Sequence, residues 1–309
     1  MANAFITPST QAGTIASAVL GILSRKIVLP ALVNTDWGID FSGKIGDTVN
    51  VRTRALPNSG TARVYTDTLR TAGTPIVIDD IAEGSVPVVI NTHVYNAVAV
   101  TDEQLSLSIV DFGQQVLELQ TTTVALYMEK ILGDVINAAT DAVGGAAAQI
   151  TGGTLAGGVH ADILTARTRL SKLNVPLDGR VLVVSPDVEQ ALLADPENRL
   201  IRYQDTGEVG TPALRDATVG RLYGMTVVTS NYLTAKSAIV FNEDAFTFVT
   251  RAPVVPDGAT FGQGAAYAGL AMRWLRDYDP AYLRDRSVVS SLVGAKEVSP
   301  LRRQSILYT

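Results

Sequence analysis

The apolar positions of the first segment follow a helical repeat. Ile15, Val19 and Ile22 recur at helical spacing, and Pro30 ends the pattern. We therefore predict an N-terminal arm over residues 1–45 that contains one amphipathic helix. A terminal helix of this kind needs an apolar surface to cover its stripe, so we expect Ile15, Val19 and Ile22 to contact the chain's own core or a neighbouring subunit.

Residues 46–100 are predicted to form a long hairpin with flanking strands. In the run Val49–Thr53, Val49, Val51 and Thr53 alternate with the polar Asn50 and Arg52, which is the period of a half-buried strand. Pro57–Gly60 is predicted to be a turn. Three apolar runs are predicted as further short strands: Ile76–Ile78, Val86–Ile90 and Val94–Val100. Because the middle of this region is too polar to build a core alone, we expect the hairpin to project from the body.

One long helical face dominates residues 101–150. Apolar residues keep to one face from Phe112 to Ala139, and both Thr101 and Asp111 are followed by residues typical of a helix start. The expected length of roughly thirty residues is well above the mean of about 11–12. We predict a spine helix that organises the fold.

Residues 151–245 are predicted to form a compact βα unit. An amphipathic helix is expected over His160–Leu173 and a buried strand over Val181–Val184. Ser185 and Pro186 then occupy the N-cap and first position of a second helix. Further strands are expected at Met225–Thr229 and Ala238–Phe241.

The last segment, residues 246–309, is predicted to return to strands. In a run from Ala265 to Tyr278, the side chains of Leu270, Met272 and Trp274 fall on one face. The run Ser287–Val293 alternates again. Strands, one long helix and a βα unit together indicate an α+β fold class.

Composition suggests that part of the surface is not exposed to water. Only 18% of the 309 residues are charged and 47% are hydrophobic, whereas ordinary domains carry roughly 25% charged residues. We therefore expect other copies of the chain to cover some of the surface. The net charge of −5 argues against a dedicated nucleic-acid binder. The apolar run Ile15–Leu23 is too short to cross a membrane, so no membrane partner is expected.

No motif points to catalysis. The chain has no cysteine and only two histidines, His93 and His160, which are too few for a zinc site. Ser185 lacks the flanking glycines of a nucleophile elbow, and a helix cap is favoured. The acidic cluster Asp79–Glu83 lacks the spacing of a calcium loop, so a solvated or salt-bridging turn is favoured. We expect no enzyme activity, no catalytic residue, no cofactor and no metal.

Four arginines make the hairpin a candidate interface: Arg52, Arg54, Arg63 and Arg70 flank the Pro57–Gly60 turn or follow it closely. Arg52 and Arg54 are two apart on a strand and share a face. Two interpretations remain open. Nearby acids of the same chain neutralise a solvated loop, or at least two of the arginines pair with acids of a neighbouring subunit.

Several collinear segments resemble the major capsid proteins of tailed bacteriophages, in the coat-protein branch found in short-tailed phages. The segments are GDTVNVR (46–52), VTDEQLSLSIVDFGQQVL (100–117), LNVPLDGRVLVVSP (173–186), VGRLYGMTVVTSNYL (219–233), FNEDAFTFVTRAPVVPDGA (241–259) and YAGLAMRWLRDYD (267–279).

The resemblance implies the Hong Kong 97-type phage capsid fold. In that fold an N-terminal arm (1–45) precedes the extended-loop hairpin (46–100). The spine helix (101–150) and the returning strands (246–309) form the peripheral domain, and residues 151–245 form the axial domain. No catalytic residue of the family is carried over.

The resemblance also implies a function and a set of partners. The chain is expected to self-assemble, through hexameric and pentameric capsomers, into the icosahedral shell that encloses phage genomic DNA. Expected partners are a scaffolding protein, a portal and, as an open option, decoration proteins, with packaged DNA contacted weakly and without sequence preference. The expected place is the virion capsid, assembled in the cytoplasm of the host bacterium.

Two alternatives stay open beside this interpretation. An encapsulin-type compartment shell shares the fold and encloses cargo enzymes instead of DNA. An α+β hydrolase with an unrecognised site belongs to a different class, and the scarcity of histidine together with the lack of a nucleophile motif disfavours it.

Overall fold

The structure is a computed structural model that describes most of the 309 residues. The described residues are 28–36, 46, 48–54, 62–79, 83–101, 116–140, 149–155, 158–194, 220–257, 261–267 and 270–309. The predicted arm helix with Ile15, Val19 and Ile22, the Pro57–Gly60 turn and the predicted helix start at Asp111 lie outside these ranges.

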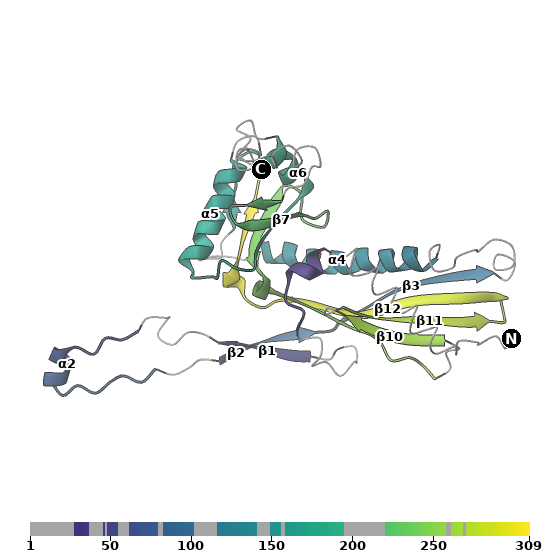
Figure 1. Ribbon diagram of the computed structural model, residues 1–309, viewed down its shortest axis with the longest axis horizontal. Helices are drawn as coiled ribbons and strands as arrows, with labels where there is room; N and C mark the ends of the chain where they lie inside the picture. Colours follow the sequence, from purple (N-terminus) through teal and green to yellow (C-terminus); the bar gives the residue numbers. More distant parts are fainter. Residues whose placement is uncertain are drawn as a thin grey trace, which may run out of the picture.

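A five-stranded antiparallel sheet forms the long half of the body (Figure 1). Its strands are β3 (Thr92–Thr101), β9 (Phe246–Arg251), β10 (Phe261–Tyr267), β11 (Leu270–Asp279) and β12 (Arg284–Glu297). The order is β10-β11-β12-β3, and β9 pairs with the end of β12. In this order β3 is an edge strand, which pairs only with β12 among the described strands.

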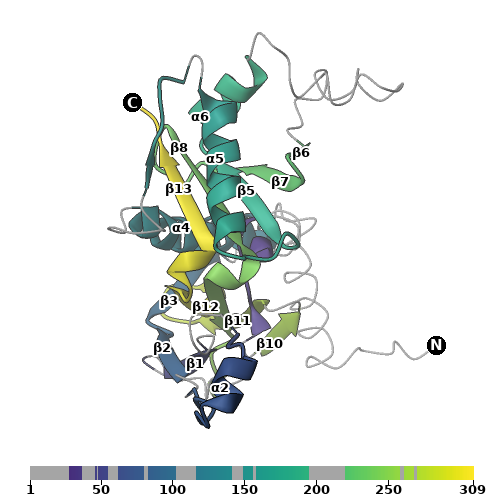
Figure 2. The same ribbon diagram turned by 90° about the vertical axis from the view of Figure 1, so that its left-hand side faces the viewer.

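A six-stranded mixed sheet forms the second half, in the order β4-β13-β8-β5-β7-β6. Its strands are β4 (Ile150–Thr151), β5 (Arg180–Val184), β6 (Arg221–Leu222), β7 (Met225–Thr229), β8 (Ser237–Asn242) and β13 (Arg303–Leu307). Helix α5 (Val159–Lys172) lies in front of this sheet in Figure 2, and α6 (Pro186–Leu193) follows β5. Both helices bury apolar faces in the core of this half, which confirms the predicted helices and central strands.

Helix α4 (Glu118–Thr140) links the two halves. Val124, Met128, Leu132 and Ile136 recur every four residues on one face, and all four are buried. They share one core with residues of both sheets, including Trp274 and Val289 of the five-stranded sheet and Ile239 and Phe241 of the six-stranded sheet. The predicted spine helix is confirmed over the described residues.

A buried polar node fixes α4 on the five-stranded sheet. Gln120 is 1% exposed, and its Nε2 donates to the carbonyl oxygens of Ser287 (2.8 Å) and Asn96 (3.2 Å). Ser287 Oγ donates to Gln120 Oε1 (2.8 Å), and Trp274 Nε1 donates to Ser287 Oγ (3.0 Å). A buried amide with its donors and acceptor satisfied sets one register between helix and sheet.

A two-stranded ribbon, β1 (Thr48–Arg54) and β2 (Glu83–Val89), leaves the body and leads into a long projection (Figure 1). The base of the ribbon is held by a small core that includes Val51, Val88 and Leu292. Gly294 allows the close approach, because a Cβ there would lie 2.5 Å from the carbonyl oxygen of Val89. The projection carries one short helix, α2 (Asp67–Thr71).

The junction between the two halves is tied by ion pairs and backbone bonds. Two 3₁₀ turns meet there, η6 (Glu243–Ala245) and η7 (Pro300–Arg302), where the Val298 N–H donates to the Ala245 carbonyl (2.9 Å). Arg302 pairs with Asp244, and the buried Arg303 pairs with Glu297 (2.5 Å). Because Arg303 is fully buried, taking away Glu297 would leave an uncompensated charge at this junction.

The structure corrects three expectations from the sequence. The run Ile76–Ile78 is not a strand, because no described strand lies beside it to pair with it. The run Ala265–Tyr278 is not one strand: it spans the end of β10 and most of β11, which pair as neighbours. Residues 246–309 do not stay in one sheet, because β13 pairs with β4 and β8 in the six-stranded sheet.

Substituting Gln120→Ala is expected to lower the free energy of unfolding by about 2–3 kcal/mol, because it leaves buried backbone carbonyls and the Ser287 hydroxyl short of partners. Urea denaturation of the unassembled subunit measures this. The matched control is Gln190→Ala on the exposed side of α6, with an expected change below about 0.5 kcal/mol. Equal effects at the two positions would show that the node does not hold the helix.

Candidate inter-subunit surfaces

The first candidate surface is the projecting loop, defined as the described residues 62–79 between β1 and β2. Its two legs are held by side chains. Arg63 bonds Asp79 through Nη2 (2.7 Å to Oδ1) and Nε (3.2 Å to Oδ1, 3.1 Å to Oδ2). The Tyr65 hydroxyl donates to the Thr74 carbonyl (2.9 Å). These cross-links define the shape of the loop without strand pairing.

Two of the four predicted arginines find acidic partners in their own chain. The Arg63 hydrogen bonds hold the pKa of Asp79 below its ordinary value of 3.8; partial burial opposes this shift and the Arg63 charge adds to it. Arg70 pairs with Asp67 one helical turn away (3.0 Å). Acids of the same chain therefore neutralise Arg63 and Arg70, as the first of the two interpretations predicted.

The other two arginines lie on the ribbon and not on the loop. Arg52 is exposed on β1, where Ser85 of β2 is its cross-strand partner. Arg54 pairs in register with Glu83 at the last position of the ladder, and its side chain lies outside the described residues. The four arginines therefore do not form one cluster. Arg52 and Arg54 remain candidates for contact with a neighbouring subunit.

Apolar side chains on the loop were missed as a surface feature by the sequence reasoning. Ile76, Val77 and Ile78 are 71%, 60% and 84% exposed, and Val64 on the opposite leg is also exposed. Isolated exposed apolar residues are common, whereas contiguous ones mark an interaction site. The signal was present as an apolar run flanked by polar residues, which we interpreted as a strand.

The N-terminal arm joins the body beside α4. The N–H groups of Val28 and Leu29 donate to the Glu129 carboxylate (2.5 Å and 3.3 Å). The 3₁₀ turn η1 (Leu29–Leu32) then packs on α4, and the Asn34 N–H bonds the carbonyls of Glu243 and Phe246. The predicted contact residues Ile15, Val19 and Ile22 are outside the described residues. The structure therefore shows where the arm meets the body, at Val28 and Leu29, and not what its predicted helix contacts.

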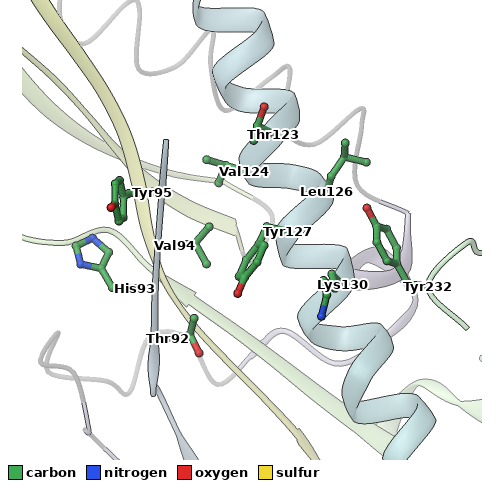
Figure 3. A pocket seen from close by; sticks show the side chains of 10 residues that line it. All are labelled: Thr92, His93, Val94, Tyr95, Thr123, Val124, Leu126, Tyr127, Lys130 and Tyr232. Carbon is green, nitrogen blue, oxygen red and sulfur yellow. The ribbon is translucent and has the colours of Figure 1, made fainter. Parts of the chain in front are cut away.

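A second candidate surface is the α4–β3 groove, a hollow of about 410 Å³ between helix α4 and the edge strand β3. Tyr95 of β3 and Leu126 and Tyr127 of α4 are among its lining residues and are 67%, 48% and 49% exposed, and in Figure 3 Tyr95 lies on the side of β3 that faces away from α4. In Figure 3, Val94 and Tyr127 occupy the space between strand and helix, and Tyr232 lies beside Leu126. The wall is thus largely aromatic and aliphatic, with the Lys130 amine at the rim.

One histidine borders this groove. Partial burial, and secondly the charge of Arg273, lower the pKa of His93 below its ordinary value of 6.5. The neutral ring is therefore favoured near neutral pH, and it meets Tyr95 edge-on at 6.4 Å between ring centres. The groove consequently gains no positive charge from this residue at neutral pH.

The described residues offer no catalytic arrangement at the positions that the sequence raised. Ser185 occupies the N-cap of α6, but it is fully buried and its Oγ accepts from the Ser237 N–H (3.2 Å). Asp79 of the acidic cluster is engaged by Arg63. Within the described ranges, no three His, Asp or Glu side chains are grouped to hold a metal, and no helix is long and apolar enough to cross a membrane.

Comparisons with known proteins give a consistent result. A family model described as phage capsid protein matches residues 82–291. The chain is similar to a solved structure described as Mycobacterium phage Che8, with a TM-score of 0.62 at 20% identity over 91% of this chain and 90% of that one. A capsid structure of the cyanophage P-SCSP1u gives 0.60 at 14% identity, over 87% of this chain and 85% of that one.

A third likeness is to the crystal structure of a virus-like particle from Pyrococcus furiosus, with a TM-score of 0.53 at 12% identity over 95% of this chain and 98% of that one. At these identities the likeness to solved structures shows a shared fold. A comparison with curated proteins found no match.

The Arg63–Asp79 pair predicts an acid-dependent loop. Because the pKa of Asp79 is lowered, the pair stabilises the loop above pH 3.8, and the contribution is lost as pH falls through the lower pKa of the folded loop. In an NMR titration of the unassembled subunit, Arg63→Gln should raise the Asp79 pKa toward 3.8.

The control for this titration is Arg70→Gln, which removes the partner of Asp67 and should leave the Asp79 pKa unchanged. An Asp79 carboxyl that titrates at its ordinary value in both the unmodified chain and Arg63→Gln would contradict the pairing.

Proposed function

This chain belongs to the phage capsid protein family, and from that premise we propose that it is the major capsid protein whose copies assemble into the shell around phage genomic DNA. The fold is of the Hong Kong 97 type, and the place of the protein is the virion capsid. The observation that carries the proposal is the family match over 82–291, which includes β3, α4 and, apart from β13 and the end of β12, the strands of both sheets.

The division of the chain into a rigid body and a projection suits a shell subunit. The body has its own apolar cores around α4 and under α5, so each copy can keep the same shape at every position in a shell. The projecting loop has exposed apolar side chains that its own chain does not cover. A contact between two different surfaces of identical subunits closes into rings when the rotation permits. Such rings are the hexameric and pentameric capsomers that we propose.

Further partners belong to the same proposal. We infer a scaffolding protein and a portal, with decoration proteins as an option, and assembly in the cytoplasm of the host bacterium. The six collinear sequence segments support placement in the branch of short-tailed-phage coat proteins. A net charge of −5 supports weak DNA contact without sequence preference, because tight binding to phosphates requires many cations that release counterions.

A compartment shell of the encapsulin type is the second candidate, and it is favoured only by the likeness to the Pyrococcus furiosus particle. The contents of purified particles separate the two functions, since a phage capsid holds DNA and a compartment holds cargo protein. The hydrolase alternative has little support, because the buried Ser185 hydroxyl is not accessible to a substrate.

The ribbon arginines provide a test of self-assembly. The double reversal Arg52→Glu with Arg54→Glu should leave the thermal melting of the subunit within a few degrees, because exposed pairs contribute only about 0–1 kcal/mol each. In electron micrographs the variant should form few or aberrant shells, since each lost pair is repeated at every identical contact. A charge-matched control is Lys172→Glu with Arg221→Glu, both exposed in the six-stranded half.

Two outcomes would count against this assignment. Normal shells from the double reversal would show that Arg52 and Arg54 are solvated surface. A purified unmodified chain that stays monomeric at every concentration and salt condition, with or without scaffold, would contradict the proposed function itself.

Removing residues 1–26 should separate folding from assembly. The six-stranded half should keep its melting transition, because none of the arm residues that the structure describes, 28–36, lies in its core. Assembly should be impaired, because the apolar stripe of Ile15, Val19 and Ile22 would be lost from its contact surface. Light scattering over a concentration series measures the effect. Shells of normal yield and stability from the truncated chain would show that the arm is dispensable.

A further inference from the structure

The first half of α4 presents apolar side chains to solvent. Leu119, Leu126 and Tyr127 are 67%, 48% and 49% exposed. The hydroxyl of Thr123, which lies between them, donates to the Leu119 carbonyl (2.9 Å), so its methyl group is left for an outside contact. These four residues, the outer stripe of α4, are spaced three or four apart and share one side of the helix.

The outer stripe is confined to the first half of the helix. Figure 1 shows this half extending past the six-stranded half, with no described helix or strand on its outer side. Further along, Lys130 is bonded to Asp134 (2.6 Å), and Asn137 donates to the Tyr232 carbonyl (2.8 Å). The outer face is therefore apolar first and polar afterwards. A second amphipathic helix is the kind of element that covers such a short apolar stripe.

The N-terminal arm leaves the body beside this stripe. The N–H groups of Val28 and Leu29 donate to the Glu129 carboxylate (2.5 Å and 3.3 Å). Glu129 and Leu126 are three residues apart on α4, so they are neighbours on the helix surface. Residues 1–27, which lie outside the described residues, are thus tethered within one helical turn of the outer stripe.

The arm carries its predicted apolar positions at a suitable distance from this tether. Ile22 and Val19 are six and nine residues before Val28. In a helix that rises about 1.5 Å per residue, they lie about 9 Å and 13.5 Å from the tether.

The outer stripe covers the same interval on α4. Leu126 and Leu119 are three and ten residues before Glu129, which places them about 4.5 Å and 15 Å from it along the helix axis. An arm helix that runs back toward the start of α4 therefore carries both Ile22 and Val19 to the level of the stripe.

Charge favours this direction over the opposite one. Arg25 and Lys26 come just before the tether, so in this arrangement they lie near the acidic Glu129. An arm that ran toward the end of α4 would place its apolar positions over the Lys130–Asp134 pair. The direction along the apolar half is thus complementary in both polarity and charge.

We propose that residues 15–26 of the arm fold back as a helix on the outer stripe of α4 in their own chain. The tether decides between the chain's own surface and that of a second copy, because a short linker gives an effective concentration in the millimolar range. The inference goes beyond the proposed function, since the contact forms in a single unassembled subunit.

Proteolysis of the unassembled subunit tests the contact. Trypsin cleaves after Arg25 and Lys26, and a docked arm helix is cleaved only when it opens. Leu119→Ser with Leu126→Ser should therefore raise the rate of this cleavage by roughly tenfold or more, because the arm loses two apolar partners. The control Leu177→Ser, an exposed leucine in the six-stranded half, should leave the rate unchanged.

Disulfide trapping tests the location of the arm, because the chain has no cysteine of its own. Val19→Cys or Ile22→Cys is combined in one chain with Leu119→Cys, Thr123→Cys or Leu126→Cys, and the dilute subunit is oxidised. At least one combination should form a disulfide within the chain at a rate independent of protein concentration. The same arm cysteines combined with Leu177→Cys should not.

Two results would overturn the docking. One is that no combination forms a disulfide within the chain, or that disulfides form only between chains and faster at higher concentration, which would assign the stripe to a second copy. The other is cleavage of the arm at the same rate in the double serine variant and the unmodified chain. Both measurements use unassembled subunits, so either result leaves the shell function standing.

Discussion

The burial of one face of α4 is the interaction on which the rest of the structure depends. Met128, Leu132 and Ile136 pack against residues of both sheets in a single core, so the two halves cannot move apart without exposing it. Gln120 fixes the position of the helix through bonds to Ser287 and Asn96. The same helix receives the arm at Glu129 and forms one wall of the groove beside β3. Both candidate surfaces on the body, the arm junction and the α4–β3 groove, are thus positioned by α4.

The projecting loop is stabilised in a different way from the body. Its geometry comes from exposed polar bonds such as Arg63–Asp79 and Tyr65–Thr74, which set direction but bury little apolar area. Its apolar side chains are directed to the surface, where they contribute nothing to the stability of the isolated chain. A subunit built in this way can fold alone and still leave a favourable free energy of burial to be realised on association.

The sequence predicted the elements whose partners are local or whose pattern is strongly periodic. Helix α4, helix α5 and the buried strand β5 were recognised because their apolar residues follow a simple period. It did not predict β13, because Arg303, Gln304 and Ser305 are polar yet buried between β4 and β8. Nor did it identify Gln120 as a buried node, since the bonding partners of this residue are distant in the sequence. The α4–β3 groove was missed for the same reason: it is made by elements brought together only in the fold.

The central claim is that copies of this chain assemble into a shell in which the projecting loop is an inter-subunit contact, and amide hydrogen exchange tests it most directly. The exchange rates of the amides of residues 74–79 are compared between unassembled subunits and purified particles, with the buried strand β5 as the internal reference. The account predicts fast exchange of residues 74–79 in the free subunit and strong slowing in particles, while β5 stays unchanged. Particles in which residues 74–79 exchange as fast as in the free subunit would contradict it.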